Sequence, residues 1–312
     1  MSGVEESDDM MYCASCGIGQ VDDVKLKDCS ACKLVKYCGV KCQKEHRPQH
    51  KRACKQRAAE LRDEILFKQP ERSHLGDCPI CCLPLPLGQE KSTMMACCSK
   101  IICNGCEYAN HIREMEGCLD RKCPFCRHPV PKSEEETKMN RMKRVEANDA
   151  FAMCQMGVRC KNEGDYDGAF EYWTKAAGLG DVGAHYNLSV MHREGLGVEK
   201  NKKEEVYHLE KAAIGGEPFA RHNLGCIEEE NGRPDRAVKH WIIAAKLGYD
   251  KSLESLKKSY RRGLVSKEDF AAALRGYQAA VDATKSPQRE EAELALSQQR
   301  EAAEAARKDR VK

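Results

Sequence analysis

"YWTKAAGLGD", residues 172–181, decides the fold of the C-terminal half of this 312-residue chain, because the pattern recurs twice downstream. The copies are "HLEKAAIGGE" at 208–217 and "HWIIAAKLGYD" at 240–250, at offsets of 36 and 32 residues. A second pattern, "AMCQMG", "AHYNLS", "ARHNLG" and "KSLESL", recurs at offsets of 32, 36 and 32 residues. Two patterns with this period predict stacked units of two helices each.

The second helix of each unit ends in Ala-Ala followed by glycine. Small alanines let neighbouring helices approach closely, and the glycine provides a left-handed helix C-terminus. The two longer intervals have an extra turn at "EGLGVEKN" and "RGLVSKED". The register places four side chains at one equivalent position, namely Trp173, Leu209, Trp241 and Tyr277. Four histidines also lie at repeat positions, where we expect structural or exposed side chains: His185, His192, His222 and His240.

These patterns resemble the Sel-one-like class of tetratricopeptide-type repeats over residues 148–284. The resemblance implies a right-handed α-helical solenoid, in which four units bury a continuous core. Residues 131–147 before it form a charged linker with helical spacing of acids and bases. Residues 285–312 after it are rich in Ala, Glu and Arg, so we expect a charged, solvated helical tail.

Cysteine usage divides the N-terminal half. Of the 20 cysteines, seven lie within 13–54 and ten within 78–126. The opening residues, "MSGVEESDDM", are polar and acidic, and no window approaches 18 consecutive apolar residues, so we expect neither a signal peptide nor a membrane span. That predicts an intracellular protein of the cytoplasm or nucleus, where cysteine clusters hold metal more often than they form disulfides. Residues 1–12 are expected to be disordered, and 55–77 to form a helical linker.

The first cysteine segment contains four pairs with ligand spacing. They are Cys13-x-x-Cys16, Cys29-x-x-Cys32, Cys38-x-x-x-Cys42 and His50-x-x-x-Cys54. Tetrahedral zinc takes four nitrogen or sulfur ligands at about 2.0–2.3 Å, so eight ligands imply two ions. His46 also has ligand spacing to His50, but we expect a surface residue on a helix.

This spacing, with "KYCGVKCQKEH" in its middle, resembles the MYND zinc finger over residues 13–54. The resemblance implies that the pairs alternate between two zinc ions. One ion would be held by Cys13, Cys16, Cys38 and Cys42, and the other by Cys29, Cys32, His50 and Cys54. It also implies docking of short proline-containing peptides near Gln43, although Arg47 stands where family members commonly have tryptophan.

The second segment contains Cys78-x-x-Cys81, Cys103-x-x-Cys106 and Cys123-x-x-Cys126. A redox dithiol would need a strand-turn-helix setting, which is not visible around "CPFCRHP". The segment resembles a RING finger over residues 78–130. The resemblance implies a first zinc site made of Cys78, Cys81, Cys103 and Cys106.

The second site of this finger is incomplete in the sequence. A RING finger has Cys-x-His five and three residues before the pair that corresponds to Cys103 and Cys106. In this chain these two positions hold Cys98 and Lys100, and a lysine does not bind zinc at neutral pH. The nearest substitute gives a site of Cys97, Cys98, Cys123 and Cys126. His111 is the alternative fourth ligand, whereas Cys82 and Cys118 are expected to take no part.

RING fingers often act as ubiquitin ligases, positioning the ubiquitin thioester of a conjugating enzyme without a covalent intermediate. The resemblance implies that Ile80 and Pro124 contact the conjugating enzyme. It also implies that Arg127 hydrogen-bonds both the enzyme and ubiquitin.

The expected architecture is therefore multidomain, with two small zinc-stabilised fingers followed by an all-α solenoid and about four Zn²⁺ ions. We predict a RING-type ubiquitin ligase or ligase adaptor. Its helical repeats would recruit protein clients, and the MYND-like finger is a second candidate for this role. The alternative is a non-catalytic scaffold that joins partner proteins, which Lys100 favours. The basic run "HRPQHKRACKQR" is not accompanied by a base-reading helix pattern, so nucleic acid is not the expected partner.

Overall fold

The computed structural model describes residues 12–20 and 24–310, and for residues 303–310 only the backbone. The segment predicted to be disordered, 1–12, lies outside the described residues except for Tyr12. The chain divides into two compact units, Met1–Lys68 and Gln69–Lys312. Among the described residues, no helix combines the length and apolar character needed to cross a lipid bilayer.

The first unit is a small hairpin followed by one long helix. Strands β1 (Lys27–Asp28) and β2 (Lys36–Tyr37) pair antiparallel, and α1 covers Val40–Leu66. The buried residues gather around the hairpin and are mostly cysteines, with Tyr37 3% exposed beside them. A segment this short lacks an apolar core of ordinary size, so its stability must come from elsewhere.

The second unit begins with a short connector, residues 69–77, which is followed by the cysteine module, residues 78–130. After the short 3₁₀ turn η1 (Gln89–Lys91), strands β3 (Ser92–Met95) and β4 (Lys100–Cys103) form an antiparallel hairpin, and α2 (Asn104–Glu116) follows directly. The turn of this hairpin carries Cys97 and Cys98, and Ser99 has a φ of 56°. The left-handed residue is the local backbone distortion that two adjacent ligand cysteines require.

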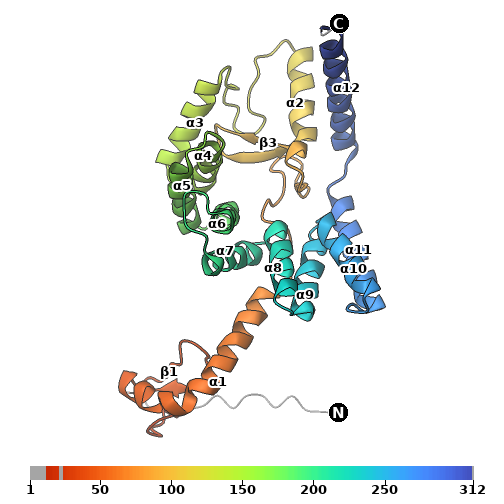
Figure 1. The fold of residues 1–312 in the computed structure, drawn as a ribbon. Coiled ribbons are helices and arrows are strands. Elements are labelled where there is room, and N and C mark those ends of the chain that lie inside the picture. Colours follow the sequence, from red (N-terminus) through yellow and green to blue (C-terminus); the bar gives the residue numbers. More distant parts are fainter. Residues whose placement is uncertain (1–11, 21–23, 311–312) are drawn as a thin grey trace. The chain divides into compact units, whose positions relative to one another are not determined.

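The rest of the unit is helical, and consecutive helices pack in antiparallel pairs (Figure 1). The repeat helices are α3 (Glu134–Glu146), α4 (Ala150–Asn162), α5 (Tyr166–Gly178), α6 (Val182–Glu194), α7 (Lys202–Ile214), α8 (Pro218–Glu230), α9 (Pro234–Lys246), α10 (Asp250–Arg261) and α11 (Lys267–Ala283), and α12 (Pro287–Arg310) ends the described chain. Side chains such as Asp149, Asp165 and Asp181 accept hydrogen bonds at the helix N-termini, which fixes the starts of the helices.

The predicted glycines lie at the ends of the second helices. Gly180, Gly216 and Gly248 occupy equivalent positions and have φ values of 90°, 89° and 92°. The left-handed conformation is accessible to glycine without steric cost, and it turns the chain into the next unit.

The predicted equivalent position is the centre of the core in the first three units. Trp173, Leu209 and Trp241 are 1%, 1% and 3% exposed. Each indole faces a glycine of the preceding helix, so Trp173 lies against Gly157 and Trp241 against Gly225. Tyr277, in the longer helix α11, is only half-buried, so the equivalence weakens in the fourth pair.

The predicted solvated tail is wrong for the first turns of α12. This helix packs against α2 of the cysteine module, and the two lie side by side in Figure 1. Ala292 is fully buried and Arg289 is 9% exposed. The linker prediction also needs correction, because α3 packs on α4 and its Val145 contacts the first repeat core.

Candidate metal centres and interaction surfaces

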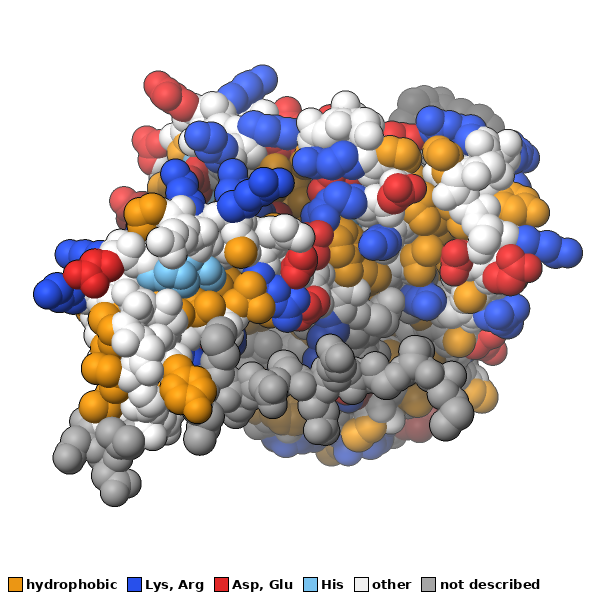
Figure 2. Space-filling view, turned by 90° about the horizontal axis from the view of Figure 1, so that it is seen from below, with side chains coloured by type: hydrophobic (Ala, Val, Ile, Leu, Met, Phe, Trp, Pro, Cys, Tyr) orange, Lys and Arg blue, Asp and Glu red, His pale blue; other side chains and the backbone are white. Residues whose placement is uncertain are grey.

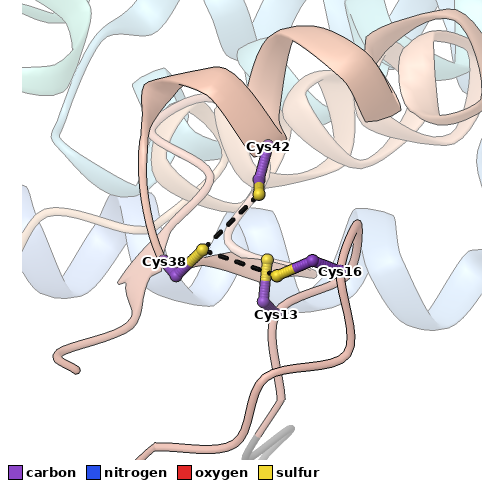
Figure 3. Close-up of side chains that lie close together, drawn as sticks. All are labelled: Cys13, Cys16, Cys38 and Cys42. Atoms are coloured by element: carbon purple, nitrogen blue, oxygen red, sulfur yellow. Dashed lines mark hydrogen bonds between the residues drawn. The ribbon is translucent and has the colours of Figure 1, made fainter.

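Four cysteines of the first unit converge from three different elements (Figure 3). Cys13 and Cys16 come from the loop before β1, Cys38 follows β2, and Cys42 lies in the first turn of α1. The Sγ atoms of Cys16 and Cys38 are 3.6 Å apart, and those of Cys38 and Cys42 are 3.5 Å apart. All four sulfurs lie within 4.8 Å of one another.

The other group of the first unit contains a histidine. Its members lie within the same distance of one another and are Cys29, Cys32, His50 and Cys54. The Sγ atom of Cys32 lies 3.2 Å from Nε2 of His50, and the Sγ atoms of Cys29 and Cys54 are 3.8 Å apart. Four ligands around zinc at about 2.3 Å have neighbouring sulfurs about 3.8 Å apart, so both groups fit a tetrahedral Zn²⁺ ion.

His46 is not the surface residue that we predicted. Its Nδ1 atom lies 3.1 Å from the hydroxyl of Tyr37, and its ring stacks on that of His50 at 5.6 Å between centroids. Tyr37 and His46 therefore hold the ring plane of His50, as outer partners of ligand histidines do. The i,i+4 spacing of the two histidines was the only sequence signal for this contact.

The cysteine module brings eight sulfurs into two further groups. One consists of Cys78, Cys81, Cys103 and Cys106, with Sγ atoms of Cys81 and Cys103 3.7 Å apart. The other consists of Cys97, Cys98, Cys123 and Cys126, with Cys97 and Cys126 3.3 Å apart and Cys98 and Cys123 3.9 Å apart. The ligand pairs alternate along the chain between the two groups. Each group therefore connects two segments of the module that are separated in the sequence.

The two alternatives for the second site are separated by the structure. Cys97 lies with the other three sulfurs, whereas His111 is outside the group and its buried Nδ1 atom has no hydrogen-bond partner among the described residues. Lys100 points to the ring of Phe125, with Nζ 5.9 Å from the centroid. Cys82 and Cys118 are exposed and belong to no group.

The four C-x-x-C turns that lie outside helices share one backbone device. The residue four positions after the first cysteine donates its N–H to that cysteine's carbonyl, over 2.9 Å in each case. This residue has a positive φ in every turn, and the set is Gly17, Lys33, Cys82 and Arg127. The turn tightens the chain so that both sulfurs point to the same side, as one ion requires.

The protonation of the thiols also points to a cation. Hydrogen bonding to Cys103 and to backbone N–H groups lowers the pKa of Cys78 to about 4, against the effect of burial. Burial raises the pKa of Cys29, but backbone hydrogen bonds lower it to a net value of about 6. Burial and nearby thiolates raise the pKa of Cys54 to about 11. A divalent cation removes this repulsion and lets all ligands ionise.

The residues predicted to contact a conjugating enzyme lie on the surface of the module. Ile80 is 41% exposed between its two ligand cysteines, and Pro124 is half-buried. Arg127 is exposed, and its Nη1 atom donates to Oδ1 of Asn110 on α2 over 3.2 Å. In the first unit, Gln43 is half-buried and Arg47 is exposed on α1, where peptide docking stays a prediction.

Basic side chains do not form a continuous patch on the face shown in Figure 2, where they lie among acidic and hydrophobic ones. Within the basic run of α1, Arg57 pairs with Glu60 at 3.2 Å and with Glu64 at 2.8 Å.

Sequence reasoning missed one cation in the cysteine module. Arg289, at the start of α12, donates to Sγ of Cys81 over 3.3 Å and to the carbonyls of Leu83 and Pro84 over 3.2 and 2.7 Å. A second contact joins the connector to the solenoid, where Nδ1 of His74 lies 3.1 Å from the carboxylate of Glu217. Both contacts join residues far apart in the chain, so the sequence carried no local signal for them.

Comparisons with known proteins identify two of the segments. Residues 13–54 match the family model "MYND finger", and residues 150–181, 182–217 and 218–249 match the model "Sel1 repeat". The matched residues do not include 78–130 or the fourth helix pair. No curated protein matches the chain.

Two solved structures are similar to the helical part. A Sel1 repeat protein from Oxalobacter formigenes is 21% identical, with a TM-score of 0.42, over 57% of this chain and 71% of its own. A protective antigen of uropathogenic Escherichia coli with an SLR fold is 22% identical, with a TM-score of 0.39, over 61% of this chain and 39% of its own. On the family matches, this chain carries a zinc-binding MYND finger and three Sel1 repeats, domains that generally mediate protein–protein interaction.

Proposed function

We propose that this chain is a zinc-dependent adaptor for ubiquitin transfer. Residues 78–130 bind a ubiquitin-conjugating enzyme in the manner of a RING finger, and the Sel1 repeats hold the protein client. The observation that carries the proposal is the alternation of four ligand pairs between two zinc-sized groups, with Ile80 and Arg127 exposed on the same module.

Arg127 has the chemistry for the central role. Its guanidinium carries five donors in a fixed fork, and one nitrogen is already oriented by Asn110. The remaining donors make no bond to a described residue, so they can bridge a conjugating enzyme and its bound ubiquitin. Such bridging holds the thioester in a reactive pose, so catalysis comes from positioning rather than from a nucleophile of this chain.

The test is discharge of a preloaded ubiquitin thioester onto free lysine by the zinc-loaded full chain, across a panel of conjugating enzymes. Arg127→Gly should slow discharge about tenfold, which corresponds to about 1.4 kcal/mol. Glycine fits the positive φ of this position, so the turn that holds Cys123 and Cys126 stays intact. Lys33→Gly, which makes the same exchange at the equivalent turn of the MYND finger, should leave discharge unchanged.

A non-catalytic scaffold is the second candidate, favoured by Lys100. Its amine lies over Phe125 in a slot where a RING finger has a histidine ligand. If the zinc-loaded wild-type chain accelerates discharge with none of the conjugating enzymes, the scaffold is the correct function and the ligase is not.

A further inference from the structure

Three potential metal ligands meet in the second Sel1 repeat, and they share no residue with the four cysteine-containing groups. His192 lies in the last turn of α6, Glu204 in the first turn of α7, and His208 one turn further along α7. One ligand atom from each lies within 4.8 Å of the other two. The connection between the helices is the extra turn "EGLGVEKN", and the N–H of Asn201 donates to the carbonyl of His192 over 3.0 Å, which closes it.

Two side chains of this group, His192 and Glu204, have polar atoms without a partner among the described residues. Nδ1 of His192 is buried and has no hydrogen bond within the described part of the chain. The Glu204 carboxylate likewise makes no hydrogen bond or ion pair with a described residue, and only its backbone N–H is capped, by Asn201. An unsatisfied buried nitrogen is costly, and a carboxylate facing two imidazoles has no counter-charge.

A third histidine, His185, contacts the group and orients His208. Nδ1 of His185 lies 2.9 Å from Nδ1 of His208, so the two atoms share one proton and Nε2 is the remaining nitrogen of His208. Ligand histidines are commonly fixed by such a hydrogen bond through the other ring nitrogen.

The third repeat provides an internal comparison. The positions equivalent to His192, Glu204 and His208 hold Glu228, Arg236 and His240, by the offsets of 36 and 32 residues. There, Nε of Arg236 donates to Glu228 over 3.0 Å, so the carboxylate has its own cation. In the first repeat, the equivalent positions hold Cys160, Gly168 and Tyr172. Among the matched repeats, only the second combines two imidazoles with an unpaired carboxylate.

We propose that His192, Glu204 and His208 bind one divalent transition-metal ion, with Zn²⁺ the best match. Two imidazole nitrogens and one carboxylate oxygen suit zinc, whereas Mg²⁺ and Ca²⁺ take oxygen ligands. Three protein ligands leave the fourth position to water or to a side chain of a bound protein. The ion joins the two helices of one repeat at the end where they are connected by the longest turn.

The test is calorimetric titration of the full chain with Zn²⁺ after the cysteine sites have been filled. One additional ion should bind per chain. Glu204→Gln and His208→Asn should each weaken this event at least tenfold. Glu199→Gln, which changes an exposed carboxylate of the connecting turn, is the matched control and should bind as the wild type does.

Cobalt distinguishes this site from the fingers. Added to the zinc-filled chain, Co²⁺ should give weak ligand-field bands without the intense thiolate charge-transfer absorption of a cysteine site. The proposal is overturned if the filled wild-type chain takes up no further ion, if uptake shows thiolate absorption only, or if Glu204→Gln binds like the control. Because Glu204 is exposed at a helix start, that variant decides the matter even if His208→Asn fails to fold.

Discussion

Gly157 and Trp173 fill one space between the two helices of the first repeat, since a Cβ atom on Gly157 would lie 2.6 Å from Nε1 of the indole. Trp241 faces Gly225 in the same way in the third repeat. In the second repeat the corresponding residues are Ser189 and Leu209. Serine is larger than the glycine of the other two repeats, and leucine is smaller than their tryptophan. The repeats therefore conserve a summed volume at this contact rather than a residue type.

Gly157→Ala should destabilise the solenoid by about 1–3 kcal/mol, because overpacking forces the indole or the helix to move. Thermal unfolding followed by helical circular dichroism measures this loss. Gly178→Ala is the control, since no atom lies within 4 Å of the added methyl and alanine favours a helix. The double variant Gly157→Ser with Trp173→Leu reproduces the pair of the second repeat. It should be more stable than the single variant Gly157→Ser, because the smaller leucine leaves room for the serine side chain. Equal effects of Gly157→Ala and Gly178→Ala would contradict the steric account.

Arg289→Ala should weaken the cysteine module by about 1.5–3 kcal/mol, the range for hydrogen bonds of a charged group. Four thiolates and one Zn²⁺ carry a net charge of about −2, and the guanidinium is the buried cation beside them. Hydrogen exchange should rise in both α2 and α12, and a competing chelator should remove zinc faster. Arg300→Ala changes an exposed arginine of the same helix and should alter neither measurement. Unchanged exchange in α2 would show that the contact contributes nothing.

The pair of His74 and Glu217 predicts a pH dependence that appears only when one partner is removed. Burial lowers the pKa of His74 from 6.5 to about 4 and raises that of Glu217 from 4.5 to about 7. The unfolded chain binds more protons at His74 than the folded chain does. Titration of His74 therefore lowers the free energy of unfolding as the pH falls from 6.5 to about 4. The folded chain binds more protons at Glu217 than the unfolded chain does. Titration of Glu217 therefore lowers the free energy of unfolding as the pH rises from 4.5 to about 7. In the wild type the two slopes oppose each other.

Glu217→Gln leaves only the histidine slope. The difference in unfolding free energy between variant and wild type should therefore grow by about 2–3 kcal/mol as the pH falls from 6.5 to 4.5. Urea unfolding at several pH values measures it, and taking the difference cancels the acid sensitivity of the zinc sites. A difference that stays constant with pH would refute the opposed slopes.

Metal removal should separate the two kinds of stability in the chain. After dialysis the protein should retain about four zinc ions, because the four groups with thiolates bind more tightly than the histidine group of the second repeat. A strong chelator should unfold residues 13–54 and 78–130 and detach α12, while the repeats keep most of the helical signal. Two retained ions, or loss of the helical signal together with zinc, would contradict this division.

Local patterns predicted much of the molecule. Each ligand pair lies within one turn, so the spacing of Cys13 and Cys16 or of Cys123 and Cys126 already specifies a shared ion. The equivalence of Trp173 and Trp241 follows from a period that stacking requires. Arg289 lies in the segment that the sequence predicts to be a solvated tail, because a single buried turn leaves no trace in a charged helix. The meeting of His192 with His208 carries no sequence signal, because it depends on the length of the turn between two helices.

The contact between Arg289 and Cys81 also sets an order of events in time. The two residues are 208 positions apart, so at 5–20 residues per second the ribosome makes the cysteines roughly 10–40 s before the guanidinium. During that interval a newly made cysteine module depends on its sulfurs alone to capture zinc. Ribosomes stalled within the repeats would thus carry a module with metal but without its cation, and quality control would meet it in that state.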